Sequence, residues 1–401
     1  MSRSLRVAVV GAGLGGLVAA NALLKRGFEV RVYEQASKLS EVGAGIQITP
    51  NAVKVLRALG LEQALMRVGF EPEGLLGLDW KSARMVFRSP LKSVVAEKYG
   101  ARHFHVHRAD LHRILFEAMP GDCIRLSARC TGITNRPDAA VLRFADGSEA
   151  EADVVVGADG IHSAVRASML GPENPRFTGC MCWRALIPSA RLPEGLVPPT
   201  VTNWLGPGGH VVHYYVRGGE WVNLVAVRER RHWIGESWTI PSSPEEMLAA
   251  YPGWHKSVQT LLAQAEHVFS WSLLDRDPLE RWSVARVTLL GDAAHPMLPF
   301  LAQGAAMAME DGYVLARQLA ERPNDLSVAL AGYEALRRPR TTRVQLAVRE
   351  RRHALHLSSS WARIRRNLAY KWHELRDPTG SPFGVEWIYK QDVTLPAHQP
   401  L

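Results

Sequence analysis

The sequence predicts an α/β protein with a ligand-binding parallel sheet, a second and mainly antiparallel sheet, and helices at its C-terminal end. Several apolar runs typical of buried strands end in turns that contain glycine. From Phe177 to about Trp271, short strand-like runs alternate with Pro and Gly. The region from Leu326 to about Leu375 is helical and basic. A chain of 401 residues is long enough for two or three domain-sized units.

The first predicted element is a βαβ unit that runs from Val7 to Glu34. Its apolar strand is followed by three glycines in the G-x-G-x-x-G spacing, Gly11, Gly13 and Gly16. This spacing allows a tight turn, a close backbone approach to a pyrophosphate, and tight helix packing. Glu34 ends the second strand, 18 residues past Gly16, where a carboxylate can bind a ribose. The unit therefore predicts a dinucleotide site; the alternative is a glycine-rich turn without a ligand.

The next segments add two further places where a ligand can approach. Gly43 and Gly45 predict backbone that passes close to a bulky group. Arg108 stands at the start of a predicted helix, where it can meet a phosphate or simply face solvent. A second buried-strand run ends at Asp159 and Gly160, which again places a turn at the end of a strand.

The central strand His210–Val216 carries the candidate proton acceptors. His210 and Tyr214 share one face of this strand because side chains alternate, and His213 points to the other face. A histidine can accept a phenol proton near neutral pH. The alternative is that these are ordinary half-exposed strand residues.

A third segment begins with the strand Arg286–Leu290, which runs into Gly291 and Asp292. Asp292 can accept hydrogen bonds from sugar-like hydroxyls. A proline-punctuated loop then leads into an Ala/Met-rich helix that ends near Ala320, and its N-terminus offers free backbone N–H groups. Further on, we expect the charge run 349–352 to form a solvated face.

Composition limits the classes of function. The sequence has no apolar run long enough to span a membrane, no signal peptide and no disulfide or zinc spacing among its four cysteines, so we expect a cytoplasmic protein without a membrane or metal partner. The net charge of +9 fits either nucleic acid or a field that steers small anions. Because no nucleic-acid motif is present, we expect no nucleic-acid partner.

Three segments in fixed order carry a family resemblance: G-A-G-L-G-G with Glu34, G-A-D-G-I-H-S-A-V-R at 157–166, and G-D-A-A-H-P-M-L-P-F-L-A-Q-G at 291–304. Over roughly residues 5–345 the chain resembles the single-component FAD-dependent aromatic hydroxylases, which include para-hydroxybenzoate, salicylate, 3-hydroxybenzoate and 6-hydroxynicotinate hydroxylases. This resemblance implies a Rossmann-like FAD-binding domain (1–75, 105–175, 273–325) interleaved with a mainly antiparallel β-sheet substrate domain (76–104, 176–272). A C-terminal helical region (326–401) follows.

The resemblance also implies roles for individual residues. The expected FAD-binding residues are Gly11, Gly13, Leu14, Gly15, Gly16, Glu34, Gln35, Gly45, Ile46, Arg108, Asp159, Gly160, Asp292, Pro299, Gln303, Gly304 and Ala305. The expected substrate pocket contains Gln47, His210, Tyr214, Pro299 and Phe300. The expected catalytic residues are His210 and Tyr214, whose spacing matches the 3-hydroxybenzoate and hydroxynicotinate relatives, and, as a weaker candidate, His213.

The implied reaction uses NADH or NADPH to reduce FAD, and O2 to form a flavin C4a-hydroperoxide that hydroxylates a small aromatic acid. At two positions this chain differs from enzymes that it resembles, and both differences concern the identity of the substrate. The 3-hydroxybenzoate enzymes carry Gln where this chain has Pro299, and the hydroxynicotinate enzymes carry His where it has Gln47. Salicylate-type enzymes resemble this chain in the pattern Met297-Leu298-Pro299, and this resemblance favours salicylate or a close hydroxybenzoate. A homodimer is a further family-level expectation.

Two other functional classes are alternatives to an aromatic hydroxylase. A flavoenzyme with a separate NADPH domain needs a second G-x-G-x-x-G unit, which the sequence lacks, and a disulfide reductase also needs a C-x4-C pair. Cys180 and Cys182 are too close for that spacing and are expected to be buried. A non-hydroxylating FAD-binding protein remains the alternative from a different functional class.

Overall fold

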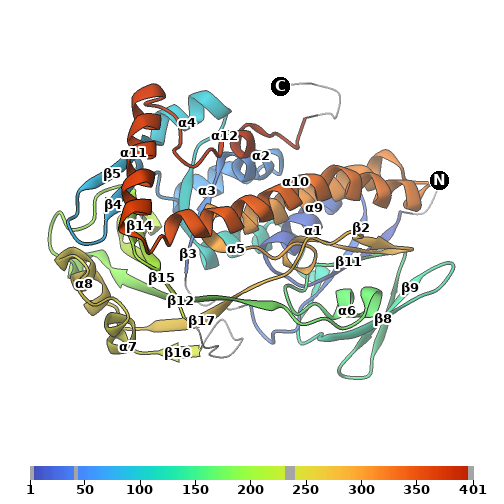
Figure 1. Cartoon of the computed structure of the whole chain (residues 1–401). Coiled ribbons are helices and arrows are strands. Elements are labelled where there is room, and N and C mark those ends of the chain that lie inside the picture. The colour runs from blue at the N-terminus through green and yellow to red at the C-terminus, as the bar shows by residue number, and fades with distance from the viewer. Residues whose placement is uncertain (1–3, 40–43, 231–239, 396–401) are drawn as a thin grey trace.

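The computed structural model describes residues 4–39, 44–230 and 240–395, and it confirms the predicted α/β class with C-terminal helices (Figure 1). The N-terminal βαβ unit lies in a six-stranded sheet, in which all pairings are parallel except that of β18 with β19. Its strands, in spatial order, are β18 (Ser283–Val284), β19 (Val287–Leu289), β11 (Val154–Gly157), β1 (Arg6–Val10), β2 (Glu29–Tyr33) and β7 (Ile124–Arg125).

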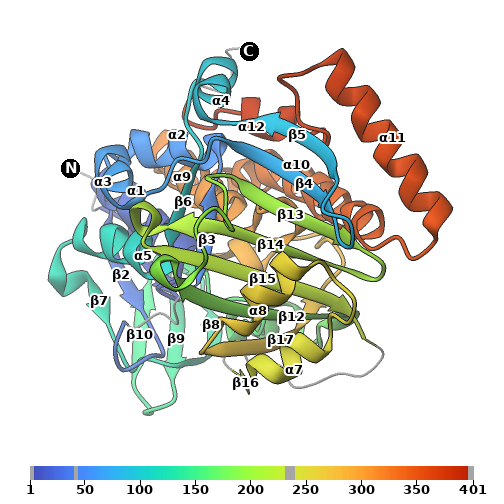
Figure 2. The same ribbon diagram turned by 90° about the vertical axis from the view of Figure 1, so that its left-hand side faces the viewer.

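The second large sheet has eight strands and is antiparallel apart from one parallel pairing, between β13 and β4. One of its faces is covered by the helices α7 (Pro244–Ala249) and α8 (Lys256–Ala263), as Figure 2 shows. In spatial order the strands are β16 (Ile240–Ser242), β17 (Val268–Asp275), β12 (Arg176–Pro188), β15 (Trp221–Glu229), β14 (Gly209–Val216), β13 (Val201–Gly206), β4 (Gly74–Asp79) and β5 (Met85–Pro90).

Two small antiparallel sheets complete the β-structure of the described residues. One contains β8 (Cys130–Asn135), β9 (Ala140–Phe144) and β10 (Glu149–Ala152). The other pairs β3 (Gly45–Ile48) with β6 (Phe104–His107). The remaining α-helices are α1 (Leu14–Leu24), α2 (Pro50–Ala58), α3 (Glu62–Val68), α4 (Lys92–Tyr99), α5 (Arg108–Glu117), α6 (Ala164–Leu170), α9 (Gly304–Glu321), α10 (Leu326–Leu355), α11 (Ser360–Arg376) and α12 (Glu386–Lys390).

Small residues let α9 approach α1 closely, as the Ala/Met-rich sequence predicts. A Cβ on Gly312 would lie 2.7 Å from the backbone nitrogen of Ala19, and one on Gly15 would lie 2.8 Å from the Cβ of Ala308. Both distances are shorter than real Cβ contacts, so larger side chains would push the helices apart. The close contact fixes α9 against the first helix of the dinucleotide-binding unit.

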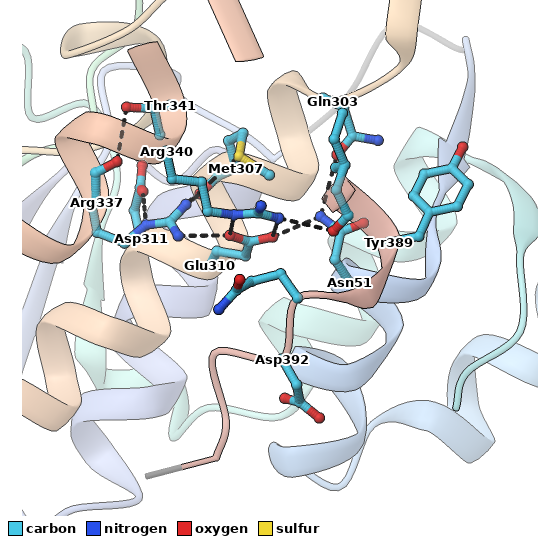
Figure 3. A network of polar contacts seen from close by, with 12 residues as sticks. Asn51, Gln303, Met307, Glu310, Asp311, Arg337, Arg340, Thr341, Tyr389 and Asp392 are labelled. Carbon is cyan, nitrogen blue, oxygen red and sulfur yellow. Dashed lines mark hydrogen bonds and ion pairs between the residues drawn. The ribbon is translucent and has the colours of Figure 1, made fainter. Parts of the chain in front are cut away.

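A buried ion network ties α9 to α10, and Figure 3 shows its side chains converging on Glu310. The Arg337 guanidinium donates to Glu310 at 2.6 Å and to Asp311 at 2.7 Å. Arg340 donates to both carboxylate oxygens of Glu310, and Asn51 of α2 donates to one of them. Burial alone would raise the pKa of Glu310, but Arg340 and Arg337 hold it below its usual value. The network therefore positions α9 through charge pairs that are largely buried.

The charge run 349–352 is not a solvated face, which corrects the expectation from sequence. Arg351 is buried, and its guanidinium lies 3.3 Å from the centroid of the Phe383 ring. Arg349 donates to Asp275 at 2.7 Å and so ties α10 to β17. Of the four residues in the run, Glu350 is the exposed one. Arg349 pairs with a carboxylate, whereas Arg351 buries its long stem and places its guanidinium on an aromatic ring.

Candidate cofactor and substrate site

The first and third glycines of the G-x-G-x-x-G turn are packed too closely for a side chain. Gly11 has a φ of +104°, and a Cβ there would lie 2.5 Å from the carbonyl oxygen of Ala158. A Cβ on Gly16 would lie 2.1 Å from the carbonyl oxygen of Gly11. A Cβ on Gly13 would meet nothing within 4 Å, so open space lies above the second glycine. This cradle fits a pyrophosphate at the N-terminus of α1, where Leu14 and Gly15 form the first turn.

The Glu34 carboxylate lies against this turn. It accepts hydrogen bonds from the backbone N–H groups of Ala12, at 2.8 Å, and Ala36, at 2.9 Å. Each carboxylate oxygen keeps acceptor capacity for a ribose hydroxyl. Gln35, the next residue, is exposed.

A cavity opens where the ends of the parallel strands meet the second sheet. Its lining combines Ile161, His162 and Asp292 from the first sheet's turns with Arg184 and the segment 271–274 from the second sheet, and continues along 296–299. No hydrogen bond from a described residue reaches the Asp292 carboxylate. Burial raises the pKa of Asp292, while the charges of His295 and Arg108 lower it. An acceptor left without a partner at the lining of a cavity fits the hydroxyl-rich chain of a bound FAD.

Asp159 is also at this edge, but its carboxylate is used within the chain. It accepts hydrogen bonds from the Ser163 hydroxyl and, at 3.1 Å, from the backbone nitrogen of Val165. These contacts hold the start of α6. Gly160 has a φ of +78° and open space beside it, so the backbone at Gly160 is the part that leaves room for a ligand.

The loop before α9 separates this cavity from a second one. Pro299 lines both cavities, and Phe300 lines the second. Gly304 and Ala305 form the first turn of α9, which has no side-chain cap, so its first N–H groups are free to face a ligand. The Gln303 side chain instead points into the protein, where its amide donates to the Thr49 hydroxyl at 3.1 Å.

The second cavity lies against the central strands of the eight-stranded sheet. It is lined by Gln47 of β3, His210 of β14, Pro299 and Phe300, together with a mostly apolar set that includes Leu75, Leu91, Val95, Val201, Val212, Leu301, Leu355, Phe383 and Val385. More than half of the lining residues are apolar, and polar side chains stand among them, a combination that is usual for a small-molecule site.

His210 presents one free ring nitrogen to this cavity. Its Nδ1 lies 2.8 Å from Nε2 of His356, which leaves its own Nε2 for a ligand. Burial, followed by the nearby His356 and Arg351, lowers the pKa of His210 well below its usual value. The imidazole is therefore neutral and able to accept a proton.

The two other catalytic candidates are placed differently. Tyr214 shares the face of His210, but its ring packs 4.4 Å from that of His105 and is not among the residues that line the cavity. Burial raises the pKa of Tyr214 to about 12. His213 faces the α7–α8 side of the sheet, where its Nε2 accepts a hydrogen bond from the Trp204 indole at 3.1 Å.

The remaining candidates, Gly45, Ile46 and Arg108, are not among the residues that line these two cavities. The Gly45 nitrogen donates to the Asn223 side chain at 2.6 Å, and a Cβ on Gly45 would collide with the same side chain. Ile46 follows it on β3 and is half-buried. Arg108 begins α5, and its backbone nitrogen donates to the carbonyl of Ala44 at 2.9 Å.

Several polar lining residues were not singled out from sequence. They are Ser89, Tyr99, His103, Asn203, Thr379, Ser381 and Tyr389. In the sequence, histidines at every second position, His103, His105 and His107, could have marked this segment. Both ring nitrogens of His103 are buried without a partner among the described residues. Tyr389 lies on α12 and reaches the cavity only through the tertiary fold, so no local pattern marks it.

Comparison with known proteins identifies the family. The FAD binding domain family matches residues 4–347. A 3-amino-4-hydroxybenzoate 2-monooxygenase of Streptomyces platensis is 45% identical over 88% of this chain and 89% of its own. The 6-hydroxynicotinate 3-monooxygenase of Pseudomonas fluorescens is 43% identical over 86% and 90%. The 3-hydroxybenzoate 6-hydroxylase of Klebsiella oxytoca is 34% identical over 99% and 100%.

Solved structures agree with this family. Klebsiella pneumoniae HpxO, complexed with FAD and uric acid, superposes with a TM-score of 0.84 at 27% identity over 94% of this chain and 95% of its own. A salicylate hydroxylase substrate complex gives 0.81 at 28% identity over 98% and 96%. The family match and the relatives each cover most of the chain, and the cavities fit the cofactor. This chain belongs to the FAD-dependent aromatic-ring monooxygenases.

Proposed function

We propose that this monooxygenase hydroxylates a small aromatic acid that already carries a ring hydroxyl, using NADH or NADPH and O2. The observation that carries the proposal is the junction at Pro299, where the cavity that contains His210 meets the cavity that contains Asp292. A ring bound beside His210 is then next to the place where the flavin ring would lie. The bound FAD supplies the redox and oxygen chemistry, and the chain supplies orientation and acid–base groups.

The residues have separate roles in this proposal. His210 accepts the proton of the ring hydroxyl at Nε2, which makes the ring electron-rich at the moment when oxygen is transferred. The apolar walls exclude water from the reacting ring. The free N–H groups at the start of α9 would stabilise negative charge on a bound flavin. The glycine turn, Glu34 and Asp292 hold the rest of the cofactor.

The names of the relatives favour one arrangement of ring substituents. Both 3-amino-4-hydroxybenzoate and 6-hydroxynicotinate describe a six-membered ring whose hydroxyl lies opposite its carboxylate. We propose that the substrate has this arrangement. Salicylate, in which the two groups are adjacent and which the sequence pattern favoured, is the second candidate because the chain also superposes on a salicylate hydroxylase.

The test is oxidation of NADH and of NADPH by the FAD-loaded protein, with product and hydrogen peroxide both quantified. The acids to add singly are 3-amino-4-hydroxybenzoate, 6-hydroxynicotinate, 4-hydroxybenzoate, 3-hydroxybenzoate and salicylate. We expect a hydroxylated product, nearly equal to the nicotinamide consumed, from an acid whose hydroxyl lies opposite the carboxylate. Product from salicylate alone would overturn the proposed arrangement. Nicotinamide oxidation that yields only peroxide with every acid would overturn the whole substrate class.

A further inference from the structure

His210 contacts a second buried histidine, His356, which has no role in the reaction proposed above. His356 lies just past the end of α10 and is buried. Its Nε2 is 2.8 Å from Nδ1 of His210, and the two ring centroids are 5.0 Å apart. The Phe300 ring centroid lies 5.4 Å from that of His210 and 5.5 Å from that of His356, so Phe300 packs against both imidazoles. The two histidines thus form a buried polar contact beside the cavity.

Beyond His356 the chain of polar groups reaches the molecular surface. Its Nδ1 lies 3.6 Å from a carboxylate oxygen of Glu229, at the end of β15, and the Glu229 side chain is 41% exposed. This distance is longer than a direct hydrogen bond, so a bridging water or a small rotation of the carboxylate is needed to join the two. Glu229 thereby connects the buried pair with solvent.

We propose that His210, His356 and Glu229 form a proton relay that carries the substrate's ring-hydroxyl proton out of the cavity. This proposal rests on the proposed function, because it assigns the route taken by the same proton. The O–H bond of the ring breaks as an N–H bond forms at Nε2 of His210. The Nδ1 proton of His210 passes to Nε2 of His356, and the Nδ1 proton of His356 passes to Glu229 and then to water. One proton leaves the cavity, and no electrons move.

The relay removes the positive charge that His210 would carry after it accepts the substrate proton, which is unfavourable in a buried site. A protonated His210 would be a cation in a buried site beside Arg351, and burial lowers the pKa of His210 well below its usual value. Burial also lowers the pKa of His356, while its contact with Glu229 acts in the opposite direction. The contact with His356 in turn lowers the pKa of Glu229, so this carboxylate is ionised near neutral pH and readily releases to water a proton that it receives.

The other groups that face His356 do not offer a competing route. The Cys180 thiol lies 3.9 Å from Nδ1, but burial raises its pKa to about 11 and it stays protonated near neutral pH. Arg352 lies 3.5 Å from Glu229, and the charge of Arg228 also acts on His356. Both arginines remain cations and cannot accept a proton. Among the described groups that face the pair, Glu229 is the acceptor that reaches solvent.

The decisive variant is Glu229→Gln, with Glu220→Gln as the matched control. Glu229 is the last residue of β15, whereas Glu220 directly precedes the first residue at the opposite end of the strand, exposed and away from His356. The first readout is ionisation of a coloured phenol probe, 4-hydroxy-3-nitrobenzoate, followed by absorbance in the FAD-loaded protein after a pH jump. We expect Glu229→Gln to slow this ionisation by about tenfold or more, because a positioned acid–base group contributes roughly 10²–10⁴.

The second readout is the pH profile of hydroxylation. Below the pKa of the free substrate, kcat of Glu229→Gln should fall with the slowed proton release. Above that pKa the substrate arrives already ionised, so the difference from the wild type should vanish. KM and FAD content should stay those of the wild type, and Glu229→Asp should recover part of the lost rate. A merely structural role of Glu229 would lower the rate at every pH.

His356→Asn tests the middle of the relay and should slow ionisation more than Glu229→Gln does. If His356→Asn fails to fold, Glu229→Gln still decides the question, because Glu229 is half-exposed. Probe ionisation and pH profiles of Glu229→Gln that match those of Glu220→Gln would overturn the relay. A wild-type protein that hydroxylates none of the acids would instead overturn the proposed function, and the probe would still test the relay.

Discussion

Two histidines three residues apart on one strand have opposite environments. His210 faces the cavity and contacts His356, whereas His213 faces the helices on the other side of the sheet and contacts Trp204. Both are almost fully buried, and burial lowers the pKa of each, that of His213 to about 3. The direction of the side chain, and not the residue type or its burial, therefore separates the proposed base from a structural histidine.

This difference gives a matched pair of substitutions. His210→Asn should keep FAD and lower the hydroxylation rate by roughly 10²–10⁴, the range that a general base contributes. His213→Asn removes an equally buried imidazole from the other face and should lower thermal stability with little change in the rate per folded molecule. The measurement is product formation per bound FAD, beside a thermal unfolding curve. Equal loss of rate in the two variants would contradict the role of His210.

At the scale of elements, α9 connects the cofactor cavity with the rest of the molecule. Its N-terminus follows the loop that separates the two cavities, its small residues contact α1, and its acidic pair Glu310–Asp311 binds Arg337 of α10 (Figure 3). His295, from the loop before α9, adds a contact of 2.5 Å to Asp311. The position of the helix N-terminus therefore depends on contacts made further along the helix.

Arg337→Met should destabilise the protein by about 3 kcal/mol or more, because it leaves two buried carboxylates short of a partner. Arg338→Met is the control: that side chain is 42% exposed and pairs loosely with Glu334 at 3.8 Å, so we expect a loss of at most about 1 kcal/mol. Chemical denaturation of both variants measures the difference. A loss for Arg337→Met as small as that of the control would show that Arg340 and His295 suffice to hold α9.

At the scale of the whole molecule, the interleaved sheets bury several histidines as neutral groups. Burial lowers the pKa of His103 to about 4 and that of His213 to about 3, and lowers the pKa of His105 and His210 in the same direction. Between these values and the ordinary histidine pKa, the unfolded chain binds more protons than the folded one. The free energy of unfolding should therefore fall as the pH is lowered from about 6.5 towards 4.

The contribution of a single buried histidine sets the size of this pH dependence of the free energy of unfolding. Each buried histidine contributes up to about 1.4 kcal/mol per pH unit in that window. Asp159 and Asp292 act in the opposite direction, because burial raises their pKa and the folded state then gains protons first. Denaturation at pH 4.5, 5.5 and 7 should show the fall, and His103→Asn should flatten it. If the free energy of unfolding of His103→Asn falls with pH as steeply as that of the wild type, His103 does not contribute to the pH dependence.

Across the described part of the chain, no helix is both long and apolar enough to cross a membrane. Cys180 and Cys182 are buried, as the sequence predicts, and neither forms a disulfide. The +9 charge is distributed partly into buried pairs such as those of Arg337 and Arg349, so net charge alone says little about what the surface binds.

The sequence by itself determined the elements whose causes are local. Glycine spacing defines the turn at Gly11–Gly16, apolar runs define the buried strands, and even spacing places His210 and Tyr214 on one face. The tertiary structure decided what depends on distant segments: that Pro299 borders two cavities, that Tyr389 reaches one of them, and that His356 stands behind His210. The spacing of residues along one strand or turn fixes their relative directions. Contacts between segments more than a hundred residues apart depend instead on how the sheets and helices pack.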